Sequence, residues 1–245
     1  GLGDVYKRQE YERIARNQEL PESVRREALL YAADLTADSG DLRSSIALRE
    51  LFVREYAPAE DIAIPQIQHI AKLEGNLGNT GRQRFWLEQI IERERGSDSL
   101  QTTRIASLAA LELADYNKQL FQDIKLHIPL QDSLARKTKA MDLAIESYET
   151  AASYQNAPVT NAATHQIASL YLDMYMALIE SERPAELTME ERAEYDLLLA
   201  EQALPFEQRA IEFDTVNPAR RDAQREDPWI ENSSLRLREL KQEVR

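Results

Sequence analysis

Residues 29–56 read LLYAADLTADSGDLRSSIALRELFVREY, and this stretch decides the fold class. Apolar residues recur at three- and four-residue spacing on both sides of a break at Ser39-Gly40-Asp41. Such spacing is typical of amphipathic helices, and the glycine permits a tight turn between them. Pro58 then stops the second helix. The stretch therefore predicts two amphipathic helices joined as an antiparallel pair.

A short tetrad marks the first helix of each predicted pair. It consists of an apolar residue, alanine, any residue and leucine, and it occurs at Ala32–Leu35, Ile70–Leu73, Leu108–Leu111 and Ile167–Leu170. The first three copies are 38 residues apart and the last follows after 59. An alanine allows two helices to cross closely, and helix pairs at such a period are typical of an α-solenoid. We therefore expect an all-α fold, an α-solenoid of antiparallel helix pairs with longer helices in the C-terminal half.

Composition excludes several other classes of protein. The 245 residues include only 7 glycines and few valines, which disfavours a sheet-rich fold. A net charge of −13 repels phosphate backbones, so nucleic acid is not expected as a partner. The absence of cysteine rules out disulfides and thiolate sites. No apolar run reaches the roughly 20 residues of a membrane helix, so no membrane insertion is expected in this fragment.

Helix starts can be predicted from residues that cap the free backbone amides. Asp132 or Ser133 is expected to cap the helix that follows the break at residues 126–129, and Thr160 the next one. Thr188 and Glu191 have the spacing of a capping box, in which each side chain binds the other's backbone.

Beyond Pro184 the tetrad pattern stops, which divides the chain into residues 10–183, the helix pairs, and 184–245. We expect the C-terminal part to be helices that pack on the solenoid or cap it. Pro205 falls inside the first of these helices and predicts a kink. A charged loop is expected at residues 220–227, followed by a last helix that begins after Pro228.

The opening residues Gly1 to Gln9, GLGDVYKRQ, resemble a translated sequencing-adapter fragment. The alternative is an ordinary polar start of a helix. If the resemblance holds, residues 1–9 are not natural protein and the true N-terminus, with any export signal, is missing.

The predicted pairs resemble tetratricopeptide (TPR) repeats, which combine a small residue on the first helix, a glycine turn and a proline near the end. Tyr171 fits the aromatic position that follows the tetrad leucine in that family. Thr36 and Glu74 replace the aromatic in the first two pairs, and Ser45 stands where alanine is usual. The resemblance therefore implies degenerate repeats.

A narrower resemblance covers residues 29–240. The stretches GNTGRQRFWLEQII at 78–91, TTRIASLAALELA at 102–114 and LLLAEQALPFEQRAIEF at 197–213 are similar to the C-terminal half of long proteobacterial envelope TPR proteins, as is the Asp-Pro-Trp segment at 227–229. These proteins are related to a TPR component of gliding motility. The resemblance implies an exported, periplasmic or envelope-associated scaffold, and the family supplies no catalytic residues.

Signals for catalysis and metal binding are missing from the sequence. His69, His127 and His165 have no carboxylate three positions before them, and no His-Glu-x-x-His helix, nucleophile elbow or phosphate loop occurs. Four glutamates between residues 186 and 194 are explained by solvation and by the dipole at a helix start. We therefore predict no enzyme, no catalytic or metal residue and no cofactor.

The function we expect is that of a non-enzymatic interaction scaffold. The first helices of stacked pairs line a concave groove that can hold a peptide or helix of a protein partner in an envelope complex. The residues expected to face this groove are Asp34, Gln68, Lys72, Asn76, His165, Ser169 and Asp173. The alternatives are a purely structural or capping segment of a longer array, and a helical enzyme of unknown type.

Overall fold

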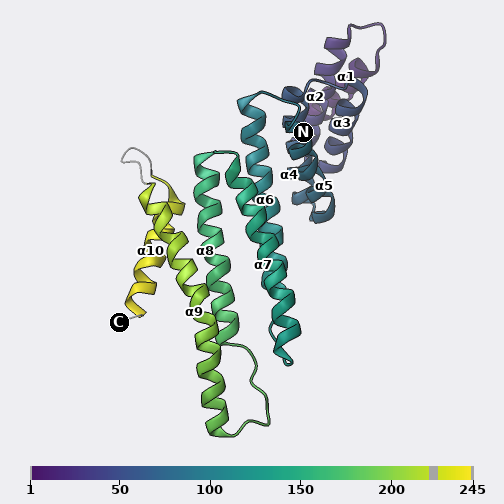
Figure 1. The fold of residues 1–245 in the computed structure, drawn as a ribbon. Helices are drawn as coiled ribbons and strands as arrows, with labels where there is room; N and C mark the ends of the chain where they lie inside the picture. Colours follow the sequence, from purple (N-terminus) through teal and green to yellow (C-terminus); the bar gives the residue numbers. More distant parts are fainter. Residues whose placement is uncertain (1, 221–225, 244–245) are drawn as a thin grey trace. The chain divides into compact units, whose positions relative to one another are not determined.

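The computed structural model describes residues 2–220 and 226–243, and in these residues the chain forms ten α-helices and no strand (Figure 1). The helices are α1 (Leu2–Arg16), α2 (Glu22–Asp38), α3 (Leu42–Tyr56), α4 (Glu60–Asn76), α5 (Thr80–Glu94), α6 (Leu100–Asp123), α7 (Leu130–Ser153), α8 (Ala157–Ile179), α9 (Met189–Ala219) and α10 (Pro228–Glu243). The all-α prediction is confirmed. The helices form two compact units, Gly1–Ala109 and Ala110–Arg245, whose boundary falls within α6.

In the first unit each helix packs on its neighbour in sequence. The contacts run from α1 to α2, α2 to α3, α3 to α4 and α4 to α5. Phe52 of α3 is fully buried in a core cluster that also contains Leu29 of α2 and Ala15 of α1. This helical arrangement, in which each element buries the apolar stripe of the next, is compatible with an α-solenoid.

The alanines of the four tetrads are all buried. The exposed fraction is 0% for Ala33, 2% for Ala71, 3% for Ala109 and 0% for Ala168. In the first pair the hydroxyl of Ser45 on α3 donates a hydrogen bond of 2.8 Å to the backbone carbonyl of Ala33 on α2. The two helices therefore approach closely at the alanine, as its small size predicts.

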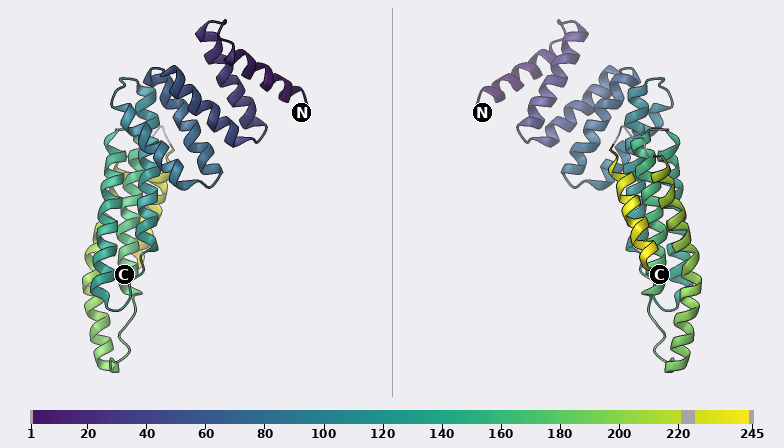
Figure 2. Two further views of the ribbon diagram at one scale, coloured as in Figure 1. Left: turned by 90° about the vertical axis from the view of Figure 1, so that its right-hand side faces the viewer. Right: turned by 90° about the vertical axis from the view of Figure 1, so that its left-hand side faces the viewer.

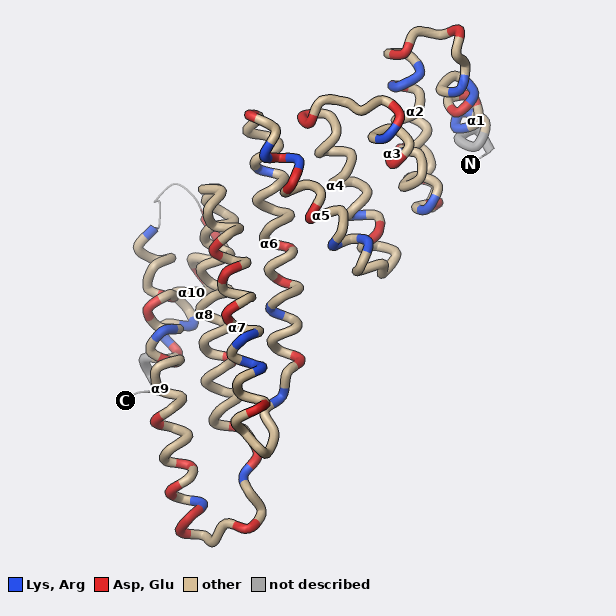
Figure 3. The backbone as a smooth tube through the Cα atoms, turned by 45° about the vertical axis from the view of Figure 1, so that its right-hand side comes forward, with Lys and Arg blue, Asp and Glu red and all other residues tan. Residues whose placement is uncertain are grey.

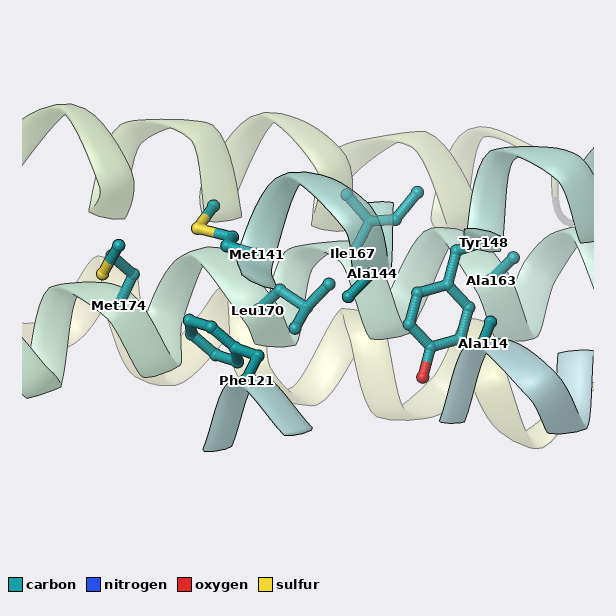
Figure 4. Packing of buried hydrophobic residues seen from close by; sticks show 9 residues of the cluster. All are labelled: Ala114, Phe121, Met141, Ala144, Tyr148, Ala163, Ile167, Leu170 and Met174. Carbon is teal, nitrogen blue, oxygen red and sulfur yellow. The ribbon is translucent and has the colours of Figure 1, made fainter. Parts of the chain in front are cut away.

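In the second unit the last helix, α10, packs on two earlier helices. In this unit α7 packs on α8, α8 on α9 and α9 on α10, and α10 also contacts α8. Figure 2 shows α10 lying against α8 and α9. The main core cluster joins α6, α7 and α8, with Phe121, Tyr148 and Leu170 among its largest members (Figure 4).

Several helix boundaries differ from those expected. The helix α7 begins at Leu130 with Pro129 at its N-cap and no capping side chain, so the prediction of Asp132 or Ser133 as cap was wrong. Ser133 instead fixes the preceding loop, because its hydroxyl donates to the carbonyl of His127 and accepts from the backbone amide of His127.

Thr160 was also wrong as a cap, since α8 begins at Ala157. A proline in its first turn, where a missing N–H costs nothing, starts this helix instead. The capping box of Thr188 and Glu191 is confirmed at the start of α9.

The long helix α9 contains Pro205, as predicted, and the kink there stays a prediction. Most of the charged loop expected at 220–227 lies outside the described residues. The division expected between residues 183 and 184 was based on where the helix-pair tetrads stop, whereas the two units are defined by compact packing. The expected division therefore stays a prediction. Leu108, an apolar tetrad position, is 41% exposed although its neighbour Ala109 is buried.

Candidate functional site

Four of the seven predicted groove residues belong to the first unit. Asp34 on α2 and Lys72 and Asn76 on α4 are exposed, and Gln68 is half-buried. Asp34 and Lys72 are 38 residues apart, as are Asp38 and Asn76, so the two helices present side chains at matching positions. These residues form what we call the α2–α4 face: Asp34, Asp38, Gln68, Lys72 and Asn76.

A buried arginine ties the two helices of this face together. Arg49 of α3 is 3% exposed, and its guanidinium donates to Asp34 on α2 and to Gln66 on α4. The ion pair with Asp34 compensates a charge that would otherwise be costly to bury. Arg49 thus links α2 and α4 through its side chain and orients the carboxylate of Asp34.

A second buried charge lies at the turn between α4 and α5. Glu74 is 3% exposed and accepts hydrogen bonds from Asn79, at 2.7 Å, and from Arg82. Arg82 also pairs with Glu50 of α3. Glu74 directly follows the leucine of the second tetrad, so a charged side chain in an ion-pair network occupies this position.

His69 lies on α4 between Gln68 and Lys72, close to the charges of Arg49, Asp34 and Lys72. Partial burial and the positive charge of Arg49 lower the pKa of its imidazole. The neutral form of the ring is therefore favoured, and the positive charge on the α2–α4 face comes from Lys72.

His165 and Ser169, both on α8, lie in a different environment, because α10 covers this side of the helix. Arg236 of α10 donates to the hydroxyl of Ser169 and, at 2.9 Å, to the backbone carbonyl of His165. The same guanidinium binds both carboxylate oxygens of Asp214 on α9, at 2.6 and 2.8 Å. The polar groups of His165 and Ser169 are thus engaged within the molecule.

The network extends through fully buried polar residues. Ser233 on α10 lies 3.0 Å from Nδ1 of His165, and it accepts a hydrogen bond from Asn217 on α9. The ring of His165 packs against Trp229, with the ring centres 5.4 Å apart. We call this set the Asp214 network: Asp214, Arg236, His165, Ser169, Ser233 and Asn217.

Histidine, serine and aspartate meet in this network, but not in the geometry of a catalytic triad. In a triad the carboxylate and the nucleophile contact opposite nitrogens of the imidazole. Here Ser233 and Asp214 both approach Nδ1 of His165, at 3.0 and 3.7 Å. Ser233 is also fully buried, so a substrate has no path to its hydroxyl. The arrangement therefore serves packing of α8, α9 and α10.

Asp173, the last predicted groove residue, accepts a hydrogen bond of 2.7 Å from Gln122 of α6. Near it, Lys118 donates to Gln166 at 2.7 Å, and burial lowers the pKa of this lysine. Asp173 also borders a hollow of about 640 Å³ at the ends of α6 and α8. The titratable residues that line this hollow are Lys125, His127, Lys137, Asp173, Glu180 and Glu182.

Sequence reasoning did not find the residues that organise these sites. Arg49, Asp214 and Arg236 are ordinary charged residues in a chain that is 30% charged, and no motif surrounds them. Glu74 follows a tetrad leucine, but nothing in the sequence indicates its ion pairs. The sequence gives one sign that Asp214 is buried: it lies three residues after Ile211, at a position of α9 where the helical spacing predicts an apolar residue. No group of residues suited to a metal ion occurs in ranges 2–220 and 226–243. In the same ranges no helix is long and apolar enough to cross a membrane.

The stability of the second unit is expected to depend on pH through Asp214. Burial opposes ionisation of this carboxyl, but the neighbouring imidazole of His165 and the hydrogen bonds and charge of Arg236 outweigh it and hold its pKa below the usual value. A lowered pKa stabilises the folded state at pH above the unfolded value of about 3.9, and this contribution is lost as the pH falls through the folded value.

Asp214→Asn provides the measurement. The free energy of unfolding of wild type should exceed that of the variant at neutral pH, and the difference should shrink as the solution is acidified below about pH 4. A difference that stays constant on acidification would contradict the assignment.

No protein-family model matches the chain, and no curated protein or solved structure was found to be similar to it.

Proposed function

We propose that the chain is a non-enzymatic protein-interaction scaffold built from degenerate TPR-like helix pairs, and that its partner binds on the α2–α4 face. The observation that carries the proposal is the matched presentation of side chains on α2 and α4. Asp34 and Lys72 occupy equivalent positions one 38-residue period apart, and Arg49 of α3 links α2 and α4 through Asp34 and Gln66.

The chemistry of this face suits an extended peptide. The amides of Gln68 and Asn76 can donate to and accept from a peptide backbone, and Lys72 can pair with an acidic side chain or terminal carboxylate. Because Asp34 already pairs with Arg49, its charge is partly satisfied before any partner arrives. We narrow the predicted groove to the first unit, since His165 and Ser169 bind Arg236 instead.

The cell compartment of the proposed scaffold follows from the resemblance alone. The stretches at 78–91, 102–114 and 197–213 are similar to envelope TPR proteins, which supports a periplasmic or envelope-associated role in a larger assembly. The alternative is a structural or capping segment of a longer TPR array, in which the α2–α4 face binds nothing. An enzyme is the weakest alternative, since the group of His165, Ser233 and Asp214 within the described residues lacks the geometry of a catalytic triad.

A peptide library displayed on phage, selected on the wild-type protein, tests the proposal. Peptides enriched on wild type should bind the variant Lys72→Glu/Asn76→Ala more weakly by about tenfold, or about 1.4 kcal/mol. Lys139→Glu is a matched control, because this exposed lysine of α7 undergoes the same reversal of charge away from the face.

Two outcomes would count against the α2–α4 face. Enriched peptides that bind the double variant and wild type equally well would place the binding surface elsewhere. A selection that enriches no peptide at all would favour the structural alternative.

A further inference from the structure

The helix α9 is much longer than the helix that covers it. It has 31 residues, whereas α10 has 16. The two run antiparallel, because Ser233 pairs with Asn217 and, three residues later, Arg236 pairs with Asp214. This register places Leu240 level with Ala210, so α10 follows the C-terminal half of α9 only, as Figures 1 and 2 show.

The N-terminal half of α9 carries an apolar stripe that no helix covers within residues 2–220 and 226–243. Ala193, Leu197, Ala200 and Leu204 recur at spacings of four, three and four residues, which places them on one side of the helix. All four are exposed, Leu197 by 61% and Leu204 by 46%. We call these four residues the α9 stripe. The spacing is that of helices that pair with another helix along an a/d seam.

The stripe is continuous with an interface that the molecule already uses. Seven residues after Leu204 comes Ile211, which is half-buried, and three residues later Asp214, which binds Arg236 of α10. Continued at the same spacing, the stripe thus reaches Asp214, where α10 meets α9, while its N-terminal end is open. The covering helix contributes buried Ile230 and Leu240 together with an arginine that meets an acidic side chain.

Acidic residues extend the stripe and flank it: Glu190, seven residues before Leu197, is in line with it, and Glu194 and Glu201 lie along one edge. Glu190, Glu194 and Glu201 are exposed, and none has an ion-pair partner within the described part of the chain. Figure 3 shows this acidic character along the N-terminal half of α9. Asp196, on the opposite edge, pairs with Arg183. Solvation explains why these glutamates are exposed, but it does not explain why they lie beside exposed leucines.

We propose that the α9 stripe binds an amphipathic helix of a partner protein, with leucine-type residues facing the stripe and lysine or arginine facing Glu190, Glu194 and Glu201. Such a helix repeats the chemistry of α10, in which apolar residues and Arg236 cover the other half of α9. A second copy of the stripe fits poorly, because its own glutamates would face those of the first copy. This surface is separate from the α2–α4 face and goes beyond the function proposed above.

Two synthetic peptides test the charge requirement. Both are amphipathic helices long enough to span residues 189–204, with leucine at the a and d positions; one carries lysine at the flanking e and g positions and the other glutamate. Binding of each fluorescent peptide to the full chain is followed by fluorescence anisotropy. The lysine peptide should bind more tightly by about tenfold or more, and less so at high salt.

Variants of neighbouring leucines test the location. Leu197→Asp, or Leu204→Asp, should weaken binding of the lysine peptide by about tenfold. Leu198→Asp is the matched control, since this residue is 52% exposed on another side of the same helix and should leave binding unchanged. The triple variant Glu190→Lys/Glu194→Lys/Glu201→Lys should reverse the preference and bind the glutamate peptide. Circular dichroism checks that each variant keeps its helices.

Equal binding of the two peptides, no binding of either, or equal effects of Leu197→Asp and Leu198→Asp would each overturn the proposal. Self-association of the wild type that Leu197→Asp abolishes would also overturn it, in favour of a second copy as the occupant. Lys72→Glu/Asn76→Ala should leave peptide binding to the stripe unchanged, so the two surfaces can fail independently.

Discussion

Arg236→Ala is expected to lower the free energy of unfolding of the second unit by about 3–5 kcal/mol. The guanidinium is the bidentate partner of Asp214, whose side chain is fully buried, and it also binds His165 and Ser169. Removing it leaves a carboxylate in the interior with no cation beside it. Because a domain is stable by only about 5–15 kcal/mol, this loss is a large part of the total.

The two tryptophans make the measurement specific to one unit. Trp86 lies in the first unit and Trp229, which packs against His165, in the second. In a Trp86→Phe background, urea unfolding followed by fluorescence therefore reports the second unit. Arg238→Ala is the matched control, since Arg238 is exposed on the same helix and should change stability by less than about 0.5 kcal/mol. Equal effects of the two variants would show that Arg236 does not stabilise the packing of α8, α9 and α10.

Phe121→Ala is expected to have a similarly large effect, about 3–5 kcal/mol. Phe121 is fully buried in the cluster with Met141, Leu170 and Met174 (Figure 4). Its ring also supports the ammonium group of Lys137, which lies 4.1 Å from the ring centre and donates to the backbone carbonyls of Phe121 and Ile124. The variant loses apolar burial, opens a cavity and weakens this contact.

Leu120→Ala separates core packing from a general effect on α6. Leu120 precedes Phe121 on the same helix and is 51% exposed, so its truncation should cost much less. Both variants are compared in the Trp86→Phe background by urea unfolding. A loss of stability that is the same for both would indicate that this end of α6 frays, and that Phe121 is not a core residue.

The helices were predictable because they depend on local signals. Apolar spacing, the glycine at residue 40 and the capping box of Thr188 each act within a few residues, and each gave the element that the structure has. The tetrad alanines were found because small size is visible in the sequence. The caps of α7 and α8 were not, because a proline, at the N-cap of α7 and in the first turn of α8, starts each helix before the expected hydroxyl or carboxyl.

The sites were less predictable because they join residues far apart in the chain. Arg236 meets His165 across 71 positions, and no local pattern distinguishes it from the other arginines. The prediction that His165 and Ser169 face a partner assumed an open side on α8, and α10 occupies that side. The partner role of Asp34, Gln68, Lys72 and Asn76 stays a prediction.

The bidentate contact between Arg236 and Asp214 has a practical consequence for fragments of this protein. Asp214 belongs to α9, but its only bidentate partner among the described residues comes from α10. A shorter expression product that stops before Pro228 would keep the buried acid and discard its counter-ion. The smallest autonomous piece of the second unit should therefore extend at least through Leu240, whose side chain is itself buried.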